Sequence, residues 1–144
     1  MPETPIHILH LEDDDDDSFL FERAIDKAAI QAKIVRVVDV AGCMDILQTT
    51  YCPDIIFLDI NVPAINGKQC LKWIRTQKQF DKTPIVMLTT STSETDIQDT
   101  FESGANRFLT KPFRYEDLSV FFSKIFLGNW KETLLNTTFQ SYVL

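Results

Sequence analysis

The sequence predicts an α/β fold in which a parallel sheet is covered by helices on both faces. Five short apolar runs alternate with segments in which apolar residues recur at helical spacing, and the connections between them are short. The run from Ile55 to Leu58 is apolar at every position, as expected of a strand buried on both faces of a parallel sheet. With 144 residues, the chain has the length of one domain.

The first half of the chain contains three of these strand and helix repeats. The predicted strands are residues 6–11, 34–38 and 55–58, and the predicted helices are residues 18–30, 41–51 and 67–78. In the first helix, Phe21, Ala24, Ile25 and Ala28 follow the i, i+3, i+4, i+7 spacing, which places them on one core-facing side.

The second half continues the alternation. Strands are predicted at residues 85–88 and 106–110, and helices at residues 94–103 and from about residue 115 onward. The last helix has an aromatic face, and its pattern allows it to continue through Gly128 to Leu135. Residues 136–144 show no clear pattern. We therefore expect a main domain at residues 5–127, followed by a helical extension and tail at residues 128–144.

Composition argues against several classes of function. The net charge of −7 disfavours nucleic-acid and anionic-membrane partners, because both are polyanions. The first residues lack the pattern of a signal peptide, and no apolar run approaches the roughly 18 residues of a membrane span, so we expect a cytoplasmic protein. Cys43, Cys52 and Cys70 are odd in number and lack a C-x-x-C spacing, which indicates neither a disulfide framework nor a zinc site.

Four of the predicted strands end in residues that can carry chemistry. These residues are Glu12 with Asp13, then Asp59, Thr89 and Lys111. Because parallel strands share one carboxyl edge and lie about 4.8 Å apart, we expect the four positions to form one cluster. His7 and His10 lie short of that edge, and we interpret both as structural.

Three carboxylates in this cluster, from Glu12, Asp13 and Asp59, would repel one another in isolation. A hard divalent cation removes the conflict, and Mg²⁺ fits because it prefers oxygen ligands and keeps waters that a phosphate can replace. The main-chain carbonyl of Asn61 is a further candidate ligand. The rest of the acidic run, residues 14–17, can cap and favour the following helix.

With a metal in place, Asp59 can act as a phosphoryl acceptor. Lys111 can place a positive charge on one phosphate oxygen, and the Thr89 hydroxyl can donate a hydrogen bond to another. Positioning and electrostatics supply most of the catalysis in phosphoryl transfer, and this set of residues offers both.

Four segments carry a family resemblance. Residues 8–14 (ILHLEDD), 58–67 (LDINVPAING), 84–90 (PIVMLTT) and 104–113 (GANRFLTKPF) together resemble the receiver domain of two-component response regulators. The resemblance covers roughly residues 5–127. It implies a flavodoxin-like, doubly wound, five-stranded parallel sheet of order 2-1-3-4-5 with five helices.

The resemblance also implies roles for individual residues. Asp59 would accept a phosphoryl group from the phosphohistidine of a sensor histidine kinase or a histidine phosphotransfer protein. Glu12 and Asp13 would hold Mg²⁺. Lys111 matches the lysine that contacts the phosphate, and the Lys111–Pro112 bond is expected to be cis.

The resemblance further implies a switch in which the protein catalyses its own phosphorylation and dephosphorylation without being an enzyme on an outside substrate. Thr89 and Phe108 match the family's switch pair, which changes a protein-interaction face. Phe108 stands where tyrosine is also common, so the hydrogen bond of a tyrosine hydroxyl is not available there.

No recognisable output domain follows, so we expect a single-domain regulator similar to the small ones that partner phytochrome-type or hybrid kinases. Its downstream protein partner is not indicated. The aromatic face of the last helix, with Trp130, Leu134 and Leu135, suggests a homodimer or partner surface. The alternative is that these residues fold back on the sheet.

Other classes of function fit less well. A Mg²⁺-dependent phosphohydrolase with Asp59 as nucleophile usually carries a second acid two residues later, where this chain has Asn61. A binding-only pseudo-receiver would keep the fold without the chemistry, but all the site residues are present. A dinucleotide-binding protein is excluded, because the four glycines never form a G-x-G-x-x-G loop.

Overall fold

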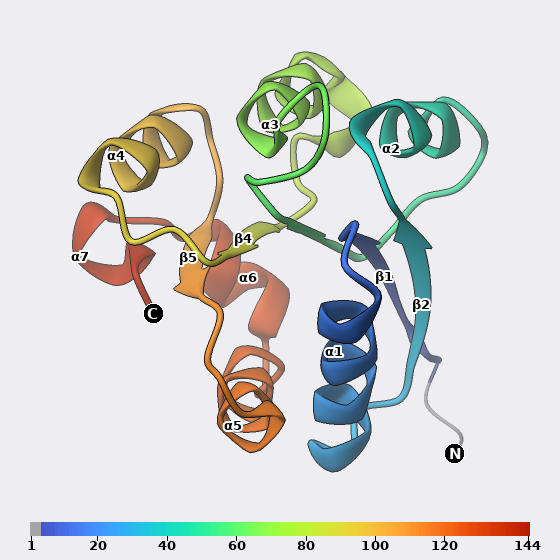
Figure 1. Cartoon of the computed structure of the whole chain (residues 1–144), viewed down its shortest axis with the longest axis vertical. Coiled ribbons are helices and arrows are strands. Elements are labelled where there is room, and N and C mark those ends of the chain that lie inside the picture. The colour runs from blue at the N-terminus through green and yellow to red at the C-terminus, as the bar shows by residue number, and fades with distance from the viewer. Residues whose placement is uncertain (1–3) are drawn as a thin grey trace.

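The computed structural model describes residues 4–144, and a single sheet lies at its centre (Figure 1). The five strands are parallel and follow the order β2-β1-β3-β4-β5, which confirms the predicted flavodoxin-like topology. The strands are β1 (Ile6–Leu11), β2 (Ala32–Val37), β3 (Ile55–Leu58), β4 (Ile85–Thr89) and β5 (Arg107–Thr110). The helices are α1 (Asp15–Lys27), α2 (Val40–Leu47), α3 (Gly67–Thr76), the 3₁₀ turn η1 (Lys78–Phe80), α4 (Glu94–Glu102), α5 (Tyr115–Ile125), α6 (Trp130–Leu135) and α7 (Phe139–Tyr142).

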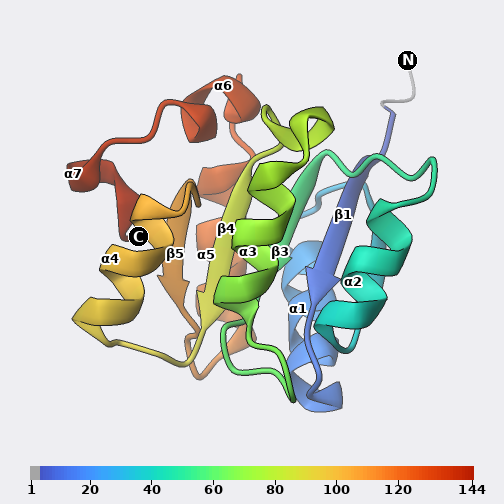
Figure 2. The same ribbon diagram turned by 90° about the horizontal axis from the view of Figure 1, so that it is seen from above.

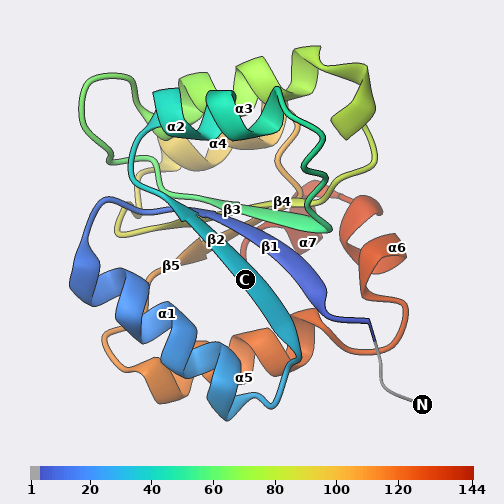
Figure 3. The same cartoon turned by 90° about the vertical axis from the view of Figure 1, so that its right-hand side faces the viewer.

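The helices form a layer on each side of the sheet. Figure 3 shows α2, α3 and α4 on one face and α1 and α5 on the other. Successive strand residues therefore enter different cores: Leu9 and Leu11 pack in the core that α2 and α3 cover, whereas Ile8 packs with Phe21 of α1. Strand β3 is likewise buried on both faces, so its sequence is apolar without alternation.

Helix α1 begins three residues earlier than predicted. Asp14 is its N-cap, and the side chain of Asp14 accepts a hydrogen bond from the main-chain N–H of Asp17 (2.9 Å). Acidic residues are favourable in a first helical turn because they face the positive end of the helix dipole. The acidic run therefore belongs partly to the helix and partly to the loop after β1.

The C-terminal part differs most from the prediction. Seven α-helices are present among residues 4–144 where five were expected, because the last predicted helix is broken into α5 and α6 and the tail forms a further short helix, α7. The break falls near Gly128, which has a φ of +59°. Beyond it, Trp130 packs edge-on against Phe126 at a centroid distance of 5.0 Å, and Leu134 is buried. These two side chains therefore pack against the rest of the molecule. This is the arrangement given above as the alternative to a dimer or partner surface.

The prediction of a cis peptide bond between Lys111 and Pro112 is wrong, because this bond is trans in the structure. The trans form of an X–Pro bond is intrinsically favoured by about 0.5–1 kcal/mol. Within residues 4–144, none of the helices has both the length and the apolar character needed to cross a membrane.

Candidate functional site

The site lies at the carboxyl edge of the sheet, where β1 and β3 end side by side. Their register pairs Leu11 with Leu58, so Glu12 and Asp59 leave their strands at the same level. Carboxylate oxygens of Glu12, Asp13 and Asp59 lie within 4.8 Å of one another. Glu12 and Asp59 are buried, whereas Asp13 is exposed to solvent. The structure therefore brings together the three acids that the strand ends predict.

Lys111, which follows β5, is the positive charge of this cluster. Its Nζ lies 2.6 Å from Glu12 Oε1, 2.6 Å from Asp59 Oδ2 and 2.8 Å from Asp17 Oδ2. Burial alone would lower the pKa of Lys111, but hydrogen bonds to the three carboxylates outweigh burial and raise it. The lysine therefore stays protonated and faces the Asp59 carboxylate.

Glu12 holds its proton more tightly than an exposed glutamate does. Burial raises the pKa of Glu12 to about 7, and the nearby charge of Asp59 also raises it, against the opposing effect of Lys111. Glu12, Asp17 and Asp59 bind the ammonium group of Lys111, and Asp13 adds a fourth carboxylate beside Glu12 and Asp59. The donor set is made of hard oxygens, so it fits a hard divalent cation.

The loop after β3 wraps around the Asp59 side chain. The main-chain N–H of Asn61 donates to Asp59 Oδ1 (3.1 Å), and Gly67 N–H donates to the carbonyl of Ile60 (3.0 Å). A Cβ atom at Gly67 would collide with the main-chain carbonyl of Asp59. Glycine therefore permits α3 to begin directly against the backbone of Asp59.

Thr89 and Phe108 lie on the two strands beyond β3. The pairing of Leu58 with Met87 places Thr89 one residue beyond the level of Asp59, and the Thr89 hydroxyl accepts a hydrogen bond from the N–H of Ser91 (3.4 Å). The Phe108 side chain is fully buried. Their role as a switch pair stays a prediction.

His10 is fully enclosed next to this site and stacks on Phe21 with a centroid distance of 3.9 Å. Burial lowers the pKa of His10 to about 3, and the charges of Lys111 and Arg36 add to this effect. A neutral, stacked ring agrees with its interpretation as a structural residue.

Two contacts of the site have no counterpart in the sequence prediction. Asp17 was expected only to favour the start of the helix, but its carboxylate binds Lys111 from α1. Arg36 of β2 donates to the main-chain carbonyl of Glu12 (2.9 Å) and to Asp15 (2.8 Å). The length of the acidic run is the one signal in the sequence that could have pointed to these partners.

Comparison with known proteins shows which family has this sequence and fold. The family model described as the response regulator receiver domain matches residues 8–122. Response regulator Rcp1 of Synechocystis is 31% identical over 120 residues, which covers 79% of this chain and 82% of Rcp1. The probable methanogenesis regulatory protein FilR2 of Methanothrix harundinacea is 30% identical over 121 residues, covering 81% of this chain and 78% of FilR2.

Solved structures agree with these relatives. The phosphorylated cyanobacterial phytochrome response regulator RcpA superposes with a TM-score of 0.78 at 26% identity, covering 94% of this chain and 97% of RcpA. The Mn²⁺-bound form of Rcp1 has a TM-score of 0.77 at 30% identity, covering 90% of this chain and 96% of Rcp1. The acidic cluster of this chain is thus set in the same fold as a regulator that binds a divalent metal. From its sequence match and its fold, this chain belongs to the response regulator receiver family.

Proposed function

We propose that this chain is a response regulator that accepts a phosphoryl group on Asp59 from a phosphohistidine. The donor would be a sensor histidine kinase or a histidine phosphotransfer protein. The observation that carries the proposal is the position of Asp59, whose carboxylate lies within 4.8 Å of two further acids and 2.6 Å from the Lys111 ammonium group.

In the transfer, an oxygen of the Asp59 carboxylate forms a bond to phosphorus. The phosphorus–nitrogen bond of the phosphohistidine breaks, and the histidine nitrogen keeps the electron pair. Lys111 neutralises part of the charge on the phosphoryl oxygens, and it is already held there by Asp17 and Glu12. The N–H of Asn61 fixes the orientation of the acceptor carboxylate.

Glu12, Asp13 and Asp59 would hold Mg²⁺, with the carbonyl of Asn61 as a further ligand. When bound, Mg²⁺ supplies positive charge that lets the dianionic phosphoryl group approach the acidic cluster. Thr89 would donate its hydroxyl hydrogen to a phosphoryl oxygen, and with Phe108 it would change the surface that a partner protein contacts. Hydrolysis of the aspartyl phosphate by water resets the switch.

The proposal is tested by intact-mass spectrometry after incubation with acetyl phosphate. Wild-type protein and the Asp59→Asn variant are compared with Mg²⁺ and with EDTA. The matched control is Asp16→Asn, which makes the same charge change at an exposed residue of the acidic run. We expect one added phosphoryl group on the wild type and on the Asp16→Asn variant, in Mg²⁺ alone, and none on Asp59→Asn. Absence of any gain in folded wild-type protein with Mg²⁺ would favour a binding-only receiver.

A further inference from the structure

The C-terminal segment, residues 137–144, covers the free edge of the sheet beside α4 (Figure 2). The main-chain N–H of Leu144 donates to the carbonyl of Phe108 in β5 (2.9 Å). Tyr142 is fully buried, and its ring lies edge-on to Phe101 of α4 at a centroid distance of 5.3 Å. The segment therefore binds the edge strand and α4 at the same time.

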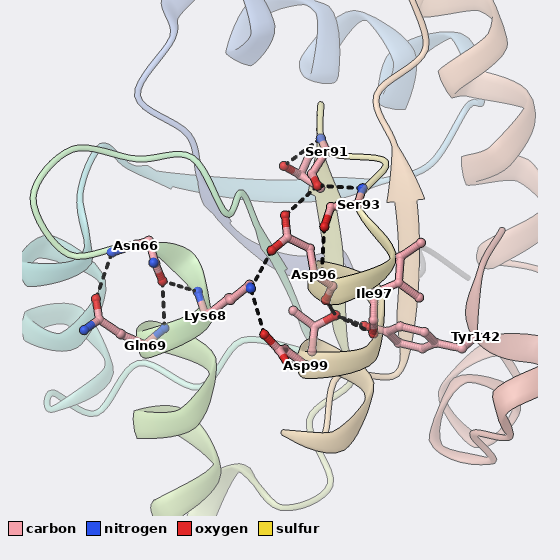
Figure 4. Close-up of polar contacts among 11 residues, drawn as sticks. Asn66, Lys68, Gln69, Ser91, Ser93, Asp96, Ile97, Asp99 and Tyr142 are labelled. Carbon is pink, nitrogen blue, oxygen red and sulfur yellow. Dashed lines mark hydrogen bonds and ion pairs between the residues drawn. The ribbon is translucent and has the colours of Figure 1, made fainter.

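A chain of hydrogen bonds runs from Tyr142 along α4 to Ser91 (Figure 4) and from there to Thr89. The N–H of Ser91 donates to Thr89 Oγ1 (3.4 Å), and the Ser91 hydroxyl donates to Asp96 Oδ2 (2.5 Å). The Thr100 hydroxyl donates to the carbonyl of Asp96 (2.8 Å) and lies 2.6 Å from the Tyr142 hydroxyl.

Helix α4 is the element through which this path runs, and it is fixed from two sides. Lys68 of α3 binds Asp96 (2.5 Å) and Asp99 (2.9 Å), while Ser91 holds Asp96 from the loop after β4 (Figure 4). A displacement of that loop therefore changes the position of the helix that carries Thr100. The hydroxyl pair of Thr100 and Tyr142 is sensitive to such a change because both side chains are buried.

Besides Tyr142, the C-terminal segment contacts the rest of the fold at three points: the Phe139 ring lies edge-on to Phe101 (centroid distance 5.3 Å), the Thr137 hydroxyl accepts from Asn106 (2.9 Å), and the Leu144 N–H donates to Phe108. Its helix, α7, has four residues, and its pairing with β5 is a single bridge between Val143 and Phe108. Phe139 and Val143 remain about half exposed. An isolated helix of this length is not stable on its own, so the segment belongs to the parts of the fold that open most easily.

We infer that residues 137–144 are a latch that closes over α4 and β5 in the resting protein and is released when Asp59 carries a phosphoryl group. The inference rests on the proposed function, in which the Thr89 hydroxyl turns to the phosphoryl oxygen. That turn breaks the long bond between Ser91 and Thr89 and loosens the loop that positions α4. Release uncovers the β5 edge and the Thr100 side of α4, a surface suited to an extended segment of a partner protein.

The latch can be tested by two measurements, the docking of residues 137–144 and the binding of a phosphoryl mimic, because the coupling between them is reciprocal. If a phosphoryl group weakens the docking of the segment by some factor, the protein with the segment undocked must bind the phosphoryl group more tightly by the same factor than the protein with the segment docked. Beryllofluoride serves as the probe, since with Mg²⁺ it mimics a phosphoryl group on a carboxylate. Amide hydrogen exchange of the full chain is measured by mass spectrometry with Mg²⁺ alone and with Mg²⁺ and beryllofluoride. We expect faster exchange at residues 139–144 with beryllofluoride and unchanged exchange in α2.

A variant supplies the second arm of the test. Tyr142→Phe removes only the hydroxyl that reaches Thr100, and Tyr51→Phe is the matched control because the Tyr51 hydroxyl is buried without a partner among the described residues. We expect Tyr142→Phe to bind beryllofluoride about fivefold more tightly by calorimetry, the lower end of typical coupling. Tyr51→Phe should match the wild type.

Two results would overturn the latch in different ways. If wild-type protein binds beryllofluoride but exchange at residues 139–144 does not change, the latch is wrong and the proposed function stands. If folded wild-type protein does not bind beryllofluoride with Mg²⁺, the proposed function and the latch both fail. The exchange measurement needs no variant, so it decides the matter even if Tyr142→Phe does not fold.

Discussion

Replacement of Asp13 by asparagine should stabilise the protein without metal and remove its response to Mg²⁺. Asp13 repels Glu12 and Asp59, whose oxygens lie within 4.8 Å of its own, and it makes no ion pair with Lys111. Two unit charges about 4.8 Å apart repel by about 0.9 kcal/mol in water and about 3.5 kcal/mol at an effective dielectric constant of about 20.

The exposure of Asp13 decides which of these values applies. Because its carboxylate is exposed, the water value is the better guide, and the two repulsions together amount to about 2 kcal/mol. In the wild type, Mg²⁺ at about 100 times its dissociation constant should add about 2.7 kcal/mol to the free energy of unfolding. Asp13→Asn should gain about 2 kcal/mol in EDTA and little more when Mg²⁺ is added.

The assay is urea denaturation in EDTA and in Mg²⁺. Asp16→Asn is the control, since it removes the same charge from an exposed residue whose side chain makes no hydrogen bond or ion pair within residues 4–144. The control should keep the wild-type response to Mg²⁺. The reasoning is refuted if Asp13→Asn is less stable than wild type in EDTA, or if Mg²⁺ stabilises it as much as the wild type.

Two further predictions concern α3 and the C-terminal segment. Gly67→Ala should lower the free energy of unfolding by about 1–3 kcal/mol and weaken Mg²⁺ binding, because the added methyl group meets the carbonyl of Asp59. The control is Gly42→Ala, whose added methyl group makes its tightest contact with a side-chain oxygen of Asp39 at 3.1 Å. An equal loss of stability in both variants would contradict this account. Burial raises the pKa of Tyr142 to about 12, although its hydrogen bond to Thr100 opposes the shift, while an unfolded tyrosine titrates near about 10. The neutral hydroxyl therefore stabilises the fold fully below about pH 10 and loses this effect between about pH 10 and 12. Urea denaturation is measured at pH 9 and 11, taken as about one unit on either side of the unfolded pKa. Between these pH values the free energy of unfolding should fall less for Tyr142→Phe than for wild type, and an equal fall in both would contradict this role of the Tyr142 hydroxyl.

Much of the site could be predicted from the sequence, because the end of a parallel strand fixes where the residue after it lies. Each parallel strand places its last residue at one shared edge, so a run of apolar residues closed by an acid or a lysine predicts where that side chain lies. Glu12, Asp59 and Lys111 meet within hydrogen-bonding distance for this reason. The unbroken apolar character of β3 predicts its burial on both faces in the same way.

The sequence did not predict the partner of Asp17. Inside a run of six acidic residues, nothing local distinguishes the residue that caps α1 from the residue that binds Lys111. The first role falls to Asp14 through a contact three residues away, whereas Asp17 meets Lys111 across 94 residues of sequence. That choice depends on how α1 is packed against the β5 end of the fold.

The sequence alone determined the five strands, their parallel arrangement and the acids that converge on Asp59, because hydrophobic pattern and strand ends are local features. Only the tertiary structure decided the course of the last 17 residues. There the helix breaks after α5, Leu134 folds inward, and Tyr142 reaches Thr100 across 42 residues of sequence. A four-residue helix and a single bridge have no periodicity of their own, so their positions follow from the buried groups to which they bind.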